Sequence, residues 1–164
     1  MHVFLSTPLG TARITGDSSG VSAISVSDAP LPDLPRPKDL PPPLQQAYDQ
    51  LTAYFNGERQ TFNFVINPIG TAFQRRVWDA LRGVPFGQTM SYLALSRQLG
   101  DEKAIRAVAA ANGRNPLWVV VPCHRIIGTN GSLTGYAGGL WRKQWLLEHE
   151  GSRRRADEGQ LTLF

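Results

Sequence analysis

The one cysteine of the sequence lies in the stretch VPCHRIIGTNG, residues 121–131, where Cys123 is followed by His124 and Arg125. A thiol attacks as its thiolate, and a base or a cation beside the sulfur raises the thiolate fraction. A cysteine next to a histidine and an arginine could therefore be a nucleophile. Three roles are open for it: a small buried core residue, a nucleophile that turns over, or a nucleophile that is used once.

The residues before Cys123 bear on this choice, because they form the apolar run LWVVV, residues 117–121, which predicts a buried strand. Burial raises the pKa of a thiol, so Cys123 would need help to ionise. Adjacent side chains on a strand point to opposite faces, so contact with His124 requires a turn or a bridging water. A third group must orient the histidine, and the candidates are Glu148 and Glu150, the acidic residues of the last expected helix.

The elements that would position these residues change in character at about residue 67. Residues 1–27 contain short apolar stretches separated by the turn sequences TPLG and GDSSG, which predict two or three antiparallel strands. The segment DAPLPDLPRPKDLPPP predicts an extended connector, because proline lacks an amide donor. Apolar spacing over residues 44–55 predicts a helix, and TFNFVI, residues 61–66, alternates as a strand does. We expect residues 1–67 to form an N-terminal α/β domain with a proline-rich connector.

From residue 68 onward the patterns are mainly helical. Apolar spacing predicts helices in TAFQRRVWDALRG, TMSYLALSRQLG, DEKAIRAVAAANG and GGLWRKQWLLEHEG. In the third of these, Asp101 is expected as the N-cap and Gly113 as the stop. The second and third are short and joined by a tight glycine-containing turn, which is typical of a helix-turn-helix. We expect residues 68–164 to form a second domain, with a frayed, arginine-rich tail from residue 152.

The third expected helix offers an unusual surface to solvent. If Ile105, Val108 and Ala109 pack inward, the outward face has cations near its ends and methyl groups between them. The residues of this outward face are Lys103, Arg106, Ala107, Ala110 and Arg114. A helix that reads base edges would carry Asn, Gln or Arg across this face. A methyl-lined helix can instead lie close against a groove of any sequence while its cations hold phosphates.

The composition disfavours several classes of protein. One cysteine cannot form an intramolecular disulfide or a multi-cysteine zinc site, and His2, His124 and His149 are not spaced as metal ligands. We therefore expect no metal and no cofactor. No apolar run approaches the roughly 18 residues of a membrane span, and the N-terminus lacks a signal-peptide pattern, which favours a cytoplasmic protein, nucleoid-associated in a bacterium. The net charge of +4 suits an anionic partner such as nucleic acid without requiring one.

A longer stretch, NPLWVVVPCHRIIGTNGSLTGYAGG, resembles the active-site signature of the O6-alkylguanine-DNA alkyltransferases, and its Pro-Cys-His-Arg core matches in full. FQRRVWDALRGVPFGQTMSY, AIRAVAAANGRNP and WLLEHEG match the same family at compatible spacing, over about residues 68–151. The resemblance implies an α+β fold, in which a small mixed α/β, RNase-H-like N-terminal domain precedes a mainly helical winged-helix, helix-turn-helix domain. The N-terminal zinc site of some members needs cysteines that this chain lacks.

The resemblance implies direct-reversal DNA repair. The alkyl group of an O6-alkylguanine would move irreversibly, once per protein molecule, from a flipped base in duplex DNA to Cys123; O4-alkylthymine is left open as a second substrate. His124 would act as the base through a bridging water, and Glu150 would orient it. Asn115 would brace the site, and Tyr92 would help to rotate the nucleotide and to deliver a proton to the guanine.

The resemblance also places residues around the substrate. Arg106 would fill the gap that the flipped guanine leaves in the base stack, which offsets part of the few kcal/mol that unstacking costs. The other expected DNA contacts are Lys103, Ala107, Ala110, Arg114 and Arg125. The expected pocket residues are Val121, Pro122, Trp118, Tyr136, Ala137 and Gly138. Ala137 stands where some members have serine, and Trp118, near the pocket mouth, is expected to influence the size of the alkyl group accepted.

Three other functions fit the sequence less well. In the family that the chain resembles, a non-catalytic subfamily that flips alkylguanine and recruits other repair factors has tryptophan in place of the acceptor cysteine, so Cys123 argues against it. A cysteine hydrolase would need an oxyanion hole and a regenerated thiol, and it would have no use for Arg106. A helix-turn-helix transcription factor is disfavoured by the methyl-lined face. The expected partner is double-stranded DNA containing O6-alkylguanine; no obligate protein partner is expected, and cooperative assembly on DNA is left open.

Overall fold

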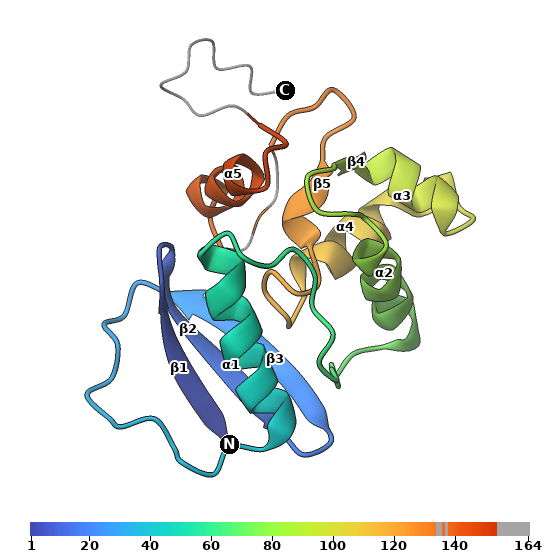
Figure 1. The fold of residues 1–164 in the computed structure, drawn as a ribbon. Coiled ribbons are helices and arrows are strands. Elements are labelled where there is room, and N and C mark those ends of the chain that lie inside the picture. Colours follow the sequence, from blue (N-terminus) through green and yellow to red (C-terminus); the bar gives the residue numbers. More distant parts are fainter. Residues whose placement is uncertain (134–135, 137, 154–164) are drawn as a thin grey trace. The chain divides into compact units, whose positions relative to one another are not determined.

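The computed structural model describes residues 1–133, 136 and 138–153, and the chain divides into two compact units (Figure 1). The first unit comprises Met1–Ile69 together with Pro116–Trp118. The second comprises Gly70–Asn115 and the residues from Val119 onward. The domain boundary expected between residues 67 and 68 lies close to the first transition. No pattern in the sequence predicts that Pro116–Trp118 return to the first unit.

The first unit is a three-stranded antiparallel sheet with a helix packed on it (Figure 1). The strands β1 (His2–Thr7), β2 (Gly10–Asp17) and β3 (Gly20–Ser27) lie in sequence order. Their buried apolar residues alternate with more exposed ones and form a core with the buried face of α1 (Pro42–Phe55). This core includes Val3, Leu5, Ala12, Ile14, Ile24, Leu44, Ala47, Leu51 and Tyr54. The antiparallel strands and the helix predicted for this part of the chain are confirmed.

The stretch TFNFVI does not form the strand that its alternation predicts. Ile66 makes a single parallel bridge to Val21, with hydrogen bonds from Val21 N to Val65 O and from Asn67 N to Val21 O. The approach is close at Gly20, where a Cβ would lie 3.1 Å from Val65 O and where φ is +141°, a value that suits glycine. This segment therefore touches the edge of β3 at one point and does not extend the sheet.

The run LWVVV, predicted as a buried strand, is buried but is not a strand. Leu117 makes one isolated bridge with Ile24, and Trp118 stacks on Phe55 of α1 with ring centroids 5.7 Å apart. Val119 then has a φ of +70°, which a β-branched residue rarely adopts, so the backbone leaves the extended path. The strand prediction is wrong because an apolar run indicates burial and leaves the backbone conformation undetermined.

The second unit is mainly helical. Its elements are α2 (Ala72–Arg82), β4 (Met90–Ser91), α3 (Tyr92–Gln98), η1 (Glu102–Ala104), α4 (Ile105–Gly113), η2 (Cys123–Arg125), β5 (Ile126–Ile127) and α5 (Leu140–His149). The two short strands pair in parallel. The four predicted helices are present, and the α+β class, with a sheet domain followed by a helical domain, is confirmed.

Side-chain caps explain where two of these elements begin. Thr71 forms a capping box with Gln74 at the start of α2. Asp101 caps η1, where its carboxylate accepts a hydrogen bond from Lys103 N at 2.9 Å. The third predicted helix is thus a 3-10 turn followed by α4, and α4 runs through Gly113, the residue expected to end it.

The helices α3 and α4 form the predicted helix-turn-helix. Gly100 lies in the turn with a φ of +93°, which glycine adopts without a Cβ clash. Val108 of α4 is buried as predicted, and Ala111 is buried with it. Ile105 and Ala109, also predicted to pack inward, are only partly buried. The outward face of α4 is therefore the one that the sequence predicts.

No helix in the described part of the chain is long and apolar enough to cross a membrane. At the end of this part, Ser152 Oγ donates a hydrogen bond to Leu147 O at 3.1 Å. Residues 154–164, which make up most of the tail predicted to fray, lie outside the described residues.

Candidate active site

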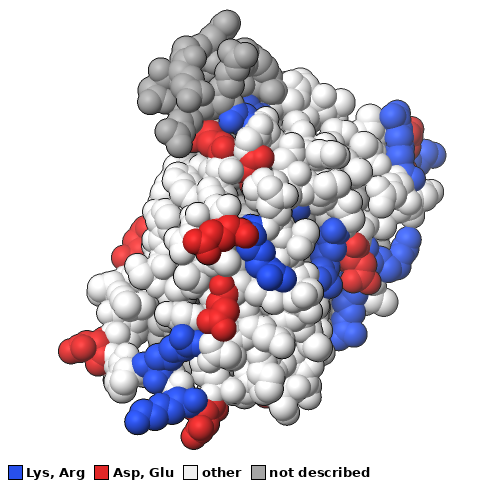
Figure 2. Space-filling model, in the orientation of Figure 1, with Lys and Arg blue, Asp and Glu red and all other residues white. Residues whose placement is uncertain are grey.

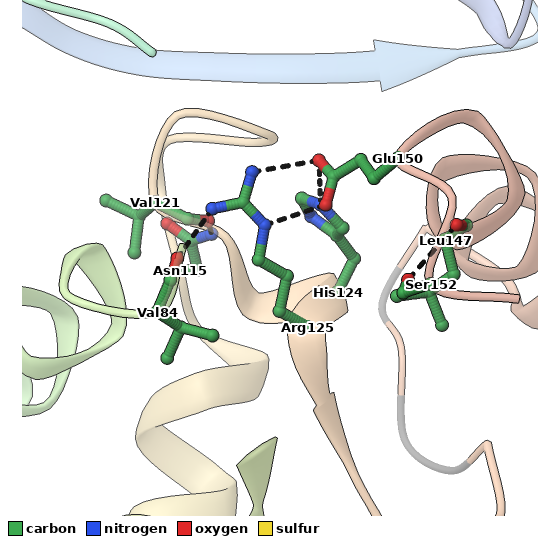
Figure 3. A network of polar contacts seen from close by, with 8 residues as sticks. All are labelled: Val84, Asn115, Val121, His124, Arg125, Leu147, Glu150 and Ser152. Carbon is green, nitrogen blue, oxygen red and sulfur yellow. Dashed lines mark hydrogen bonds and ion pairs between the residues drawn. The ribbon is translucent and has the colours of Figure 1, made fainter. Parts of the chain in front are cut away.

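Cys123 begins the 3-10 turn η2 at the end of the buried run, and it is 7% exposed. Its amide N donates to Val121 O at 2.8 Å, so the backbone has the turn that contact between Cys123 and His124 requires. Asn115 holds this turn, because its Nδ2 group donates to Val121 O at 2.7 Å (Figure 3). The same Nδ2 group also donates to Cys123 Sγ at 3.2 Å. The expected bracing residue thus contacts both the backbone of the turn and the sulfur.

Burial raises the pKa of the Cys123 thiol above its usual value. The hydrogen bond from Asn115 and the positive charge of Lys143 oppose this effect without reversing it. The resting sulfur is therefore a thiol, and it needs a base before it can attack.

A buried polar network surrounds Glu150, which directly follows α5 (Figure 3). His124 Nε2 lies 2.9 Å from Glu150 Oε2. Arg125 donates to both carboxylate oxygens, from Nε to Oε1 at 2.8 Å and from Nη2 to Oε2 at 2.9 Å. We call His124, Arg125 and Glu150 the Glu150 network. It brings together residues that lie 25 and 26 positions apart in the sequence.

The Glu150 network fixes the protonation of its members. Burial raises the pKa of the Glu150 carboxyl, but hydrogen bonds from His124 and Arg125 outweigh it and hold that pKa well below its usual range. Burial lowers the pKa of His124, and Glu150 opposes this. A neutral imidazole therefore donates from Nε2 to a carboxylate, and Nδ1 keeps the lone pair. That Nδ1 atom is buried and has no hydrogen-bond partner among the described residues, so it can accept a proton.

Arg125 corrects a sequence-based expectation, because it is buried and cannot serve as the predicted DNA contact. Besides the two bonds to Glu150, its Nη1 group donates to Val84 O at 2.7 Å. A buried carboxylate is stable only when a cation or hydrogen-bond donors compensate its charge, and Arg125 does both for Glu150. The expectation failed because residue type alone cannot distinguish a cation that binds phosphate from one that neutralises an internal acid.

Lys143 of α5 is a site residue that the sequence reasoning missed. Its side chain is fully buried, and its Nζ group donates to Ile126 O. Burial lowers the pKa of Lys143 to about 8, while the interaction with Cys123 opposes this. A signal was present, because Lys143 lies three and four residues before Leu146 and Leu147, on the inward face of one helix.

The outward face of α4 has the predicted composition. All five residues expected on this face are exposed: Lys103 in η1, Arg106, Ala107 and Ala110 in α4, and Arg114 directly after α4. Within the described residues, none of its three cations has a carboxylate at ion-pair distance. Figure 2 shows Lys and Arg side chains over the α2 and α3 region of the same unit, with Asp and Glu side chains among them. The outward face itself is exposed and carries three cations, as contact with phosphates requires.

The expected pocket residues are only partly described. Val121 and Pro122 are buried directly before the cysteine. Tyr136 and Gly138 approach one another closely, since a Cβ on Gly138 would lie 2.9 Å from the Tyr136 ring. Ala137 lies outside the described residues. Among the residues that the structure describes, no group of three or more His, Cys, Asp or Glu side chains is arranged to hold a metal ion.

Trp118 and Tyr92 are the remaining expected site residues. Trp118 is buried in the first unit against Phe55, and its place at a pocket mouth stays a prediction. Tyr92 is the first residue of α3 and is half-buried. Its hydroxyl oxygen accepts a hydrogen bond from Asn112 Nδ2 at 3.4 Å, a contact that the sequence reasoning also missed.

Two family models and several curated relatives match this chain. Residues 1–68 match the family described as "6-O-methylguanine DNA methyltransferase, ribonuclease-like domain", and residues 72–152 match its "DNA binding domain". A methylated-DNA–protein-cysteine methyltransferase of Methanosarcina acetivorans is 39% identical over 160 residues, which are 92% of this chain and 98% of the relative. The chain belongs to this family. The family inferred from the Pro-Cys-His-Arg signature is therefore confirmed.

Bacterial methyltransferases of the family are also similar. A methylated-DNA–protein-cysteine methyltransferase of Mycobacterium tuberculosis is 53% identical over 118 residues, which are 72% of this chain and 70% of the relative. The crystal structure of the Mycobacterium tuberculosis OGT in complex with DNA has a TM-score of 0.80 at 42% identity and covers 96% of each chain. The enzyme class of the family, a methyltransferase whose acceptor is a protein cysteine, agrees with a site built around one buried thiol.

Proposed function

We propose that this methyltransferase repairs O6-alkylguanine in double-stranded DNA by moving the alkyl group to Sγ of Cys123. The observation that carries the proposal is the buried contact of 2.9 Å between His124 Nε2 and Glu150 Oε2, in a family member whose one cysteine directly precedes His124. The complex of the similar Mycobacterium tuberculosis protein with DNA supports DNA as the partner. O4-alkylthymine remains a second candidate substrate.

The groups of the site can perform each step of the transfer. His124 Nδ1 takes the thiol proton, through a bridging water as the family resemblance implies, and Glu150 stabilises the resulting imidazolium. The thiolate attacks the alkyl carbon, and a carbon–sulfur bond forms as the bond from carbon to O6 breaks. The electron pair stays on the guanine, which takes up a proton. Tyr92 is the proposed donor of this proton.

The substrate must leave the duplex before this chemistry can occur, because a stacked base keeps its O6 substituent out of reach. The outward face of α4 supports this step. Arg106 would occupy the gap in the base stack, and Lys103 and Arg114 would hold phosphates. Ala107 and Ala110 would let the helix lie close in the minor groove, from which wedge-inserting proteins usually approach. Binding of this kind reads no sequence.

We expect the transfer to be irreversible and to occur once per molecule. The product is a thioether, and the sequence has no second cysteine that could displace the alkyl group. We further propose that the protein acts in the cytoplasm, on the nucleoid in a bacterium, where its DNA substrate would lie. The proposal requires no protein partner.

Intact mass spectrometry tests the proposed function. The protein is mixed with excess duplex that contains one O6-methylguanine, and we expect a mass gain of one methyl group per molecule, mapped to Cys123. Cys123→Ser should lose transfer but keep DNA binding, because sulfur contributes nucleophilicity and little affinity. Continued conversion of excess duplex would refute single use and would indicate an enzyme that regenerates its thiol.

A further inference from the structure

Asn112 is a buried amide on the inward face of α4, and it is 1% exposed. Its Nδ2 group donates to the Tyr92 hydroxyl oxygen at 3.4 Å, while its Oδ1 atom is buried without a hydrogen-bond partner among the described residues. A buried acceptor that is left unsatisfied lowers stability, so an apolar residue would serve the fold better at this position. The presence of a buried asparagine at position 112 is therefore explained by its contact with Tyr92 and not by a contribution to stability.

Neighbouring contacts fix the direction in which Asn112 points. Trp78 of α2 donates from Nε1 to Ala111 O at 2.9 Å, which ties the carboxyl-terminal part of α4 to α2. Val108, one turn before Asn112, is fully buried on the same face. With α4 held in this rotation, position 112 faces the first residue of α3, which is Tyr92.

We propose that Asn112 positions the Tyr92 hydroxyl for proton delivery to the guanine, and this inference rests on the function proposed above. A phenol has one donor and two acceptor positions. With the amide hydrogen of Asn112 on its oxygen, the hydroxyl proton of Tyr92 is directed away from Asn112. The protein thus holds the phenol oxygen through Asn112, and on this proposal a bound base accepts the hydroxyl proton.

The same contact would assist the proton transfer itself. When Tyr92 gives its proton to the leaving guanine, negative charge develops on the phenol oxygen until solvent returns a proton. The amide N–H of Asn112 already points at this oxygen and would stabilise that charge without reorganisation. The distance of 3.4 Å is long, as hydrogen bonds of catalytic groups often are before the substrate binds. Asn112 is therefore a positioning residue that acts through Tyr92.

A double-mutant cycle tests this assignment through single-turnover rates of methyl transfer from an O6-methylguanine duplex. Asn112→Leu removes the donor and the acceptor while keeping a similar size. It should slow transfer about fivefold, the factor that one neutral hydrogen bond supplies, without lowering the melting temperature. In a Tyr92→Phe background, the same substitution should change the rate by less than about twofold, as expected for a residue whose partner is already absent.

Val108→Ala is the matched control, because Val108 is also buried on α4 but cannot hydrogen-bond to Tyr92. It should lower the melting temperature and affect the rate equally in both backgrounds. Equal losses for Asn112→Leu with and without the Tyr92 hydroxyl would overturn the proposal, as would a wild-type rate for Tyr92→Phe. Failure of the wild-type protein to take up a methyl group would refute the proposed function instead.

Discussion

The second unit carries two sets of charges in opposite surroundings. In the Glu150 network, the charges of Arg125 and Glu150 are buried and meet at 2.8–2.9 Å. On the outward face of α4, the cations are exposed to solvent. Water screens exposed charges and leaves them nearly independent, whereas a desolvated charge depends on its partner. Substitutions in the Glu150 network should therefore have large and coupled effects, and substitutions on the outward face should have small and additive ones.

Glu150→Gln should have the largest effect on both stability and transfer rate, because it keeps the shape of the side chain and removes its charge. Arg125 would then be a buried cation without a counter-charge, which costs about 3–5 kcal/mol of unfolding free energy. Transfer should also slow, on the order of a hundredfold or more, because the imidazolium of His124 loses its stabilising carboxylate. Urea unfolding and single-turnover rates measure the two effects.

Glu148→Gln is the control for this substitution. Glu148 is partly exposed and accepts a hydrogen bond from Gln144 one turn earlier in α5, so the change should stay within about 0.5 kcal/mol. Wild-type transfer rates for both glutamate variants would show that the proposed relay through Glu150 is wrong.

The pH dependence of the protein should report the burial of His124. Its pKa lies below 6.5 in the folded state, so the imidazole remains a base at pH 6.5 and the transfer rate should fall only at more acidic pH. The unfolded chain binds a proton at His124 near pH 6.5 and the folded protein does not. The free energy of unfolding should therefore decrease as pH falls from 6.5 toward the folded pKa.

Urea midpoints measured against pH check this sign, and His124→Gln should remove the first part of the decrease. Glu150 acts in the same direction at lower pH, because its depressed pKa stabilises the fold above its ordinary value of 4.5 and this stabilisation is lost below it. A transfer rate that falls with an apparent pKa above 6.5 would contradict the assignment of a neutral buried His124.

Arg106→Ala tests the exposed cations of the outward face of α4. If Arg106 fills the gap in the base stack, its loss should slow transfer from duplex DNA about tenfold. The effect is limited because Arg106 offsets only part of the few kcal/mol that base extrusion costs. Reaction with the free base O6-benzylguanine needs no extrusion and should change little. The melting temperature should also stay constant, because the side chain is exposed. Equal losses on both substrates would mean that Arg106 supports the fold or the pocket.

Lys103→Ala should have the smallest effect. As one phosphate contact, Lys103 should contribute about one unit to the slope of log affinity against log salt concentration. Arg97→Ala is a suitable control, because Arg97 is also exposed but pairs with Glu102 at 2.9 Å, and its loss should alter the slope less. An unchanged slope for Lys103→Ala would remove this residue from the DNA contacts.

The residues with local signatures were predictable from the sequence. The Pro-Cys-His-Arg motif led to the family, which is confirmed. The spacing of cations and alanines predicted the outward face of α4, and its side chains are exposed as expected. Both predictions depend on short, continuous segments of the sequence, in which the residue types and their periodicity are enough to indicate the motif or the exposed face of a helix.

The residues that were missed or misassigned depend on contacts between distant parts of the chain. Arg125 was predicted to contact DNA because the sequence does not indicate its pairing with Glu150, which lies 25 positions away. Asn112 reaches Tyr92 across 20 positions, and local apolar spacing gives no indication of such a pair. The sequence also does not indicate the positive φ of Val119, because a run of valines favours the extended backbone of a strand.

The return of Pro116–Trp118 to the first unit bears on how the protein could be divided or recombined. A cut between residues 67 and 68 would leave β3 without its bridge from Leu117 to Ile24, and Phe55 without the ring that stacks on it. The carboxyl-terminal fragment would carry the same apolar side chains without their partners. The two units are therefore not interchangeable modules: a chimaera that exchanged one of them would have to exchange these three residues as well.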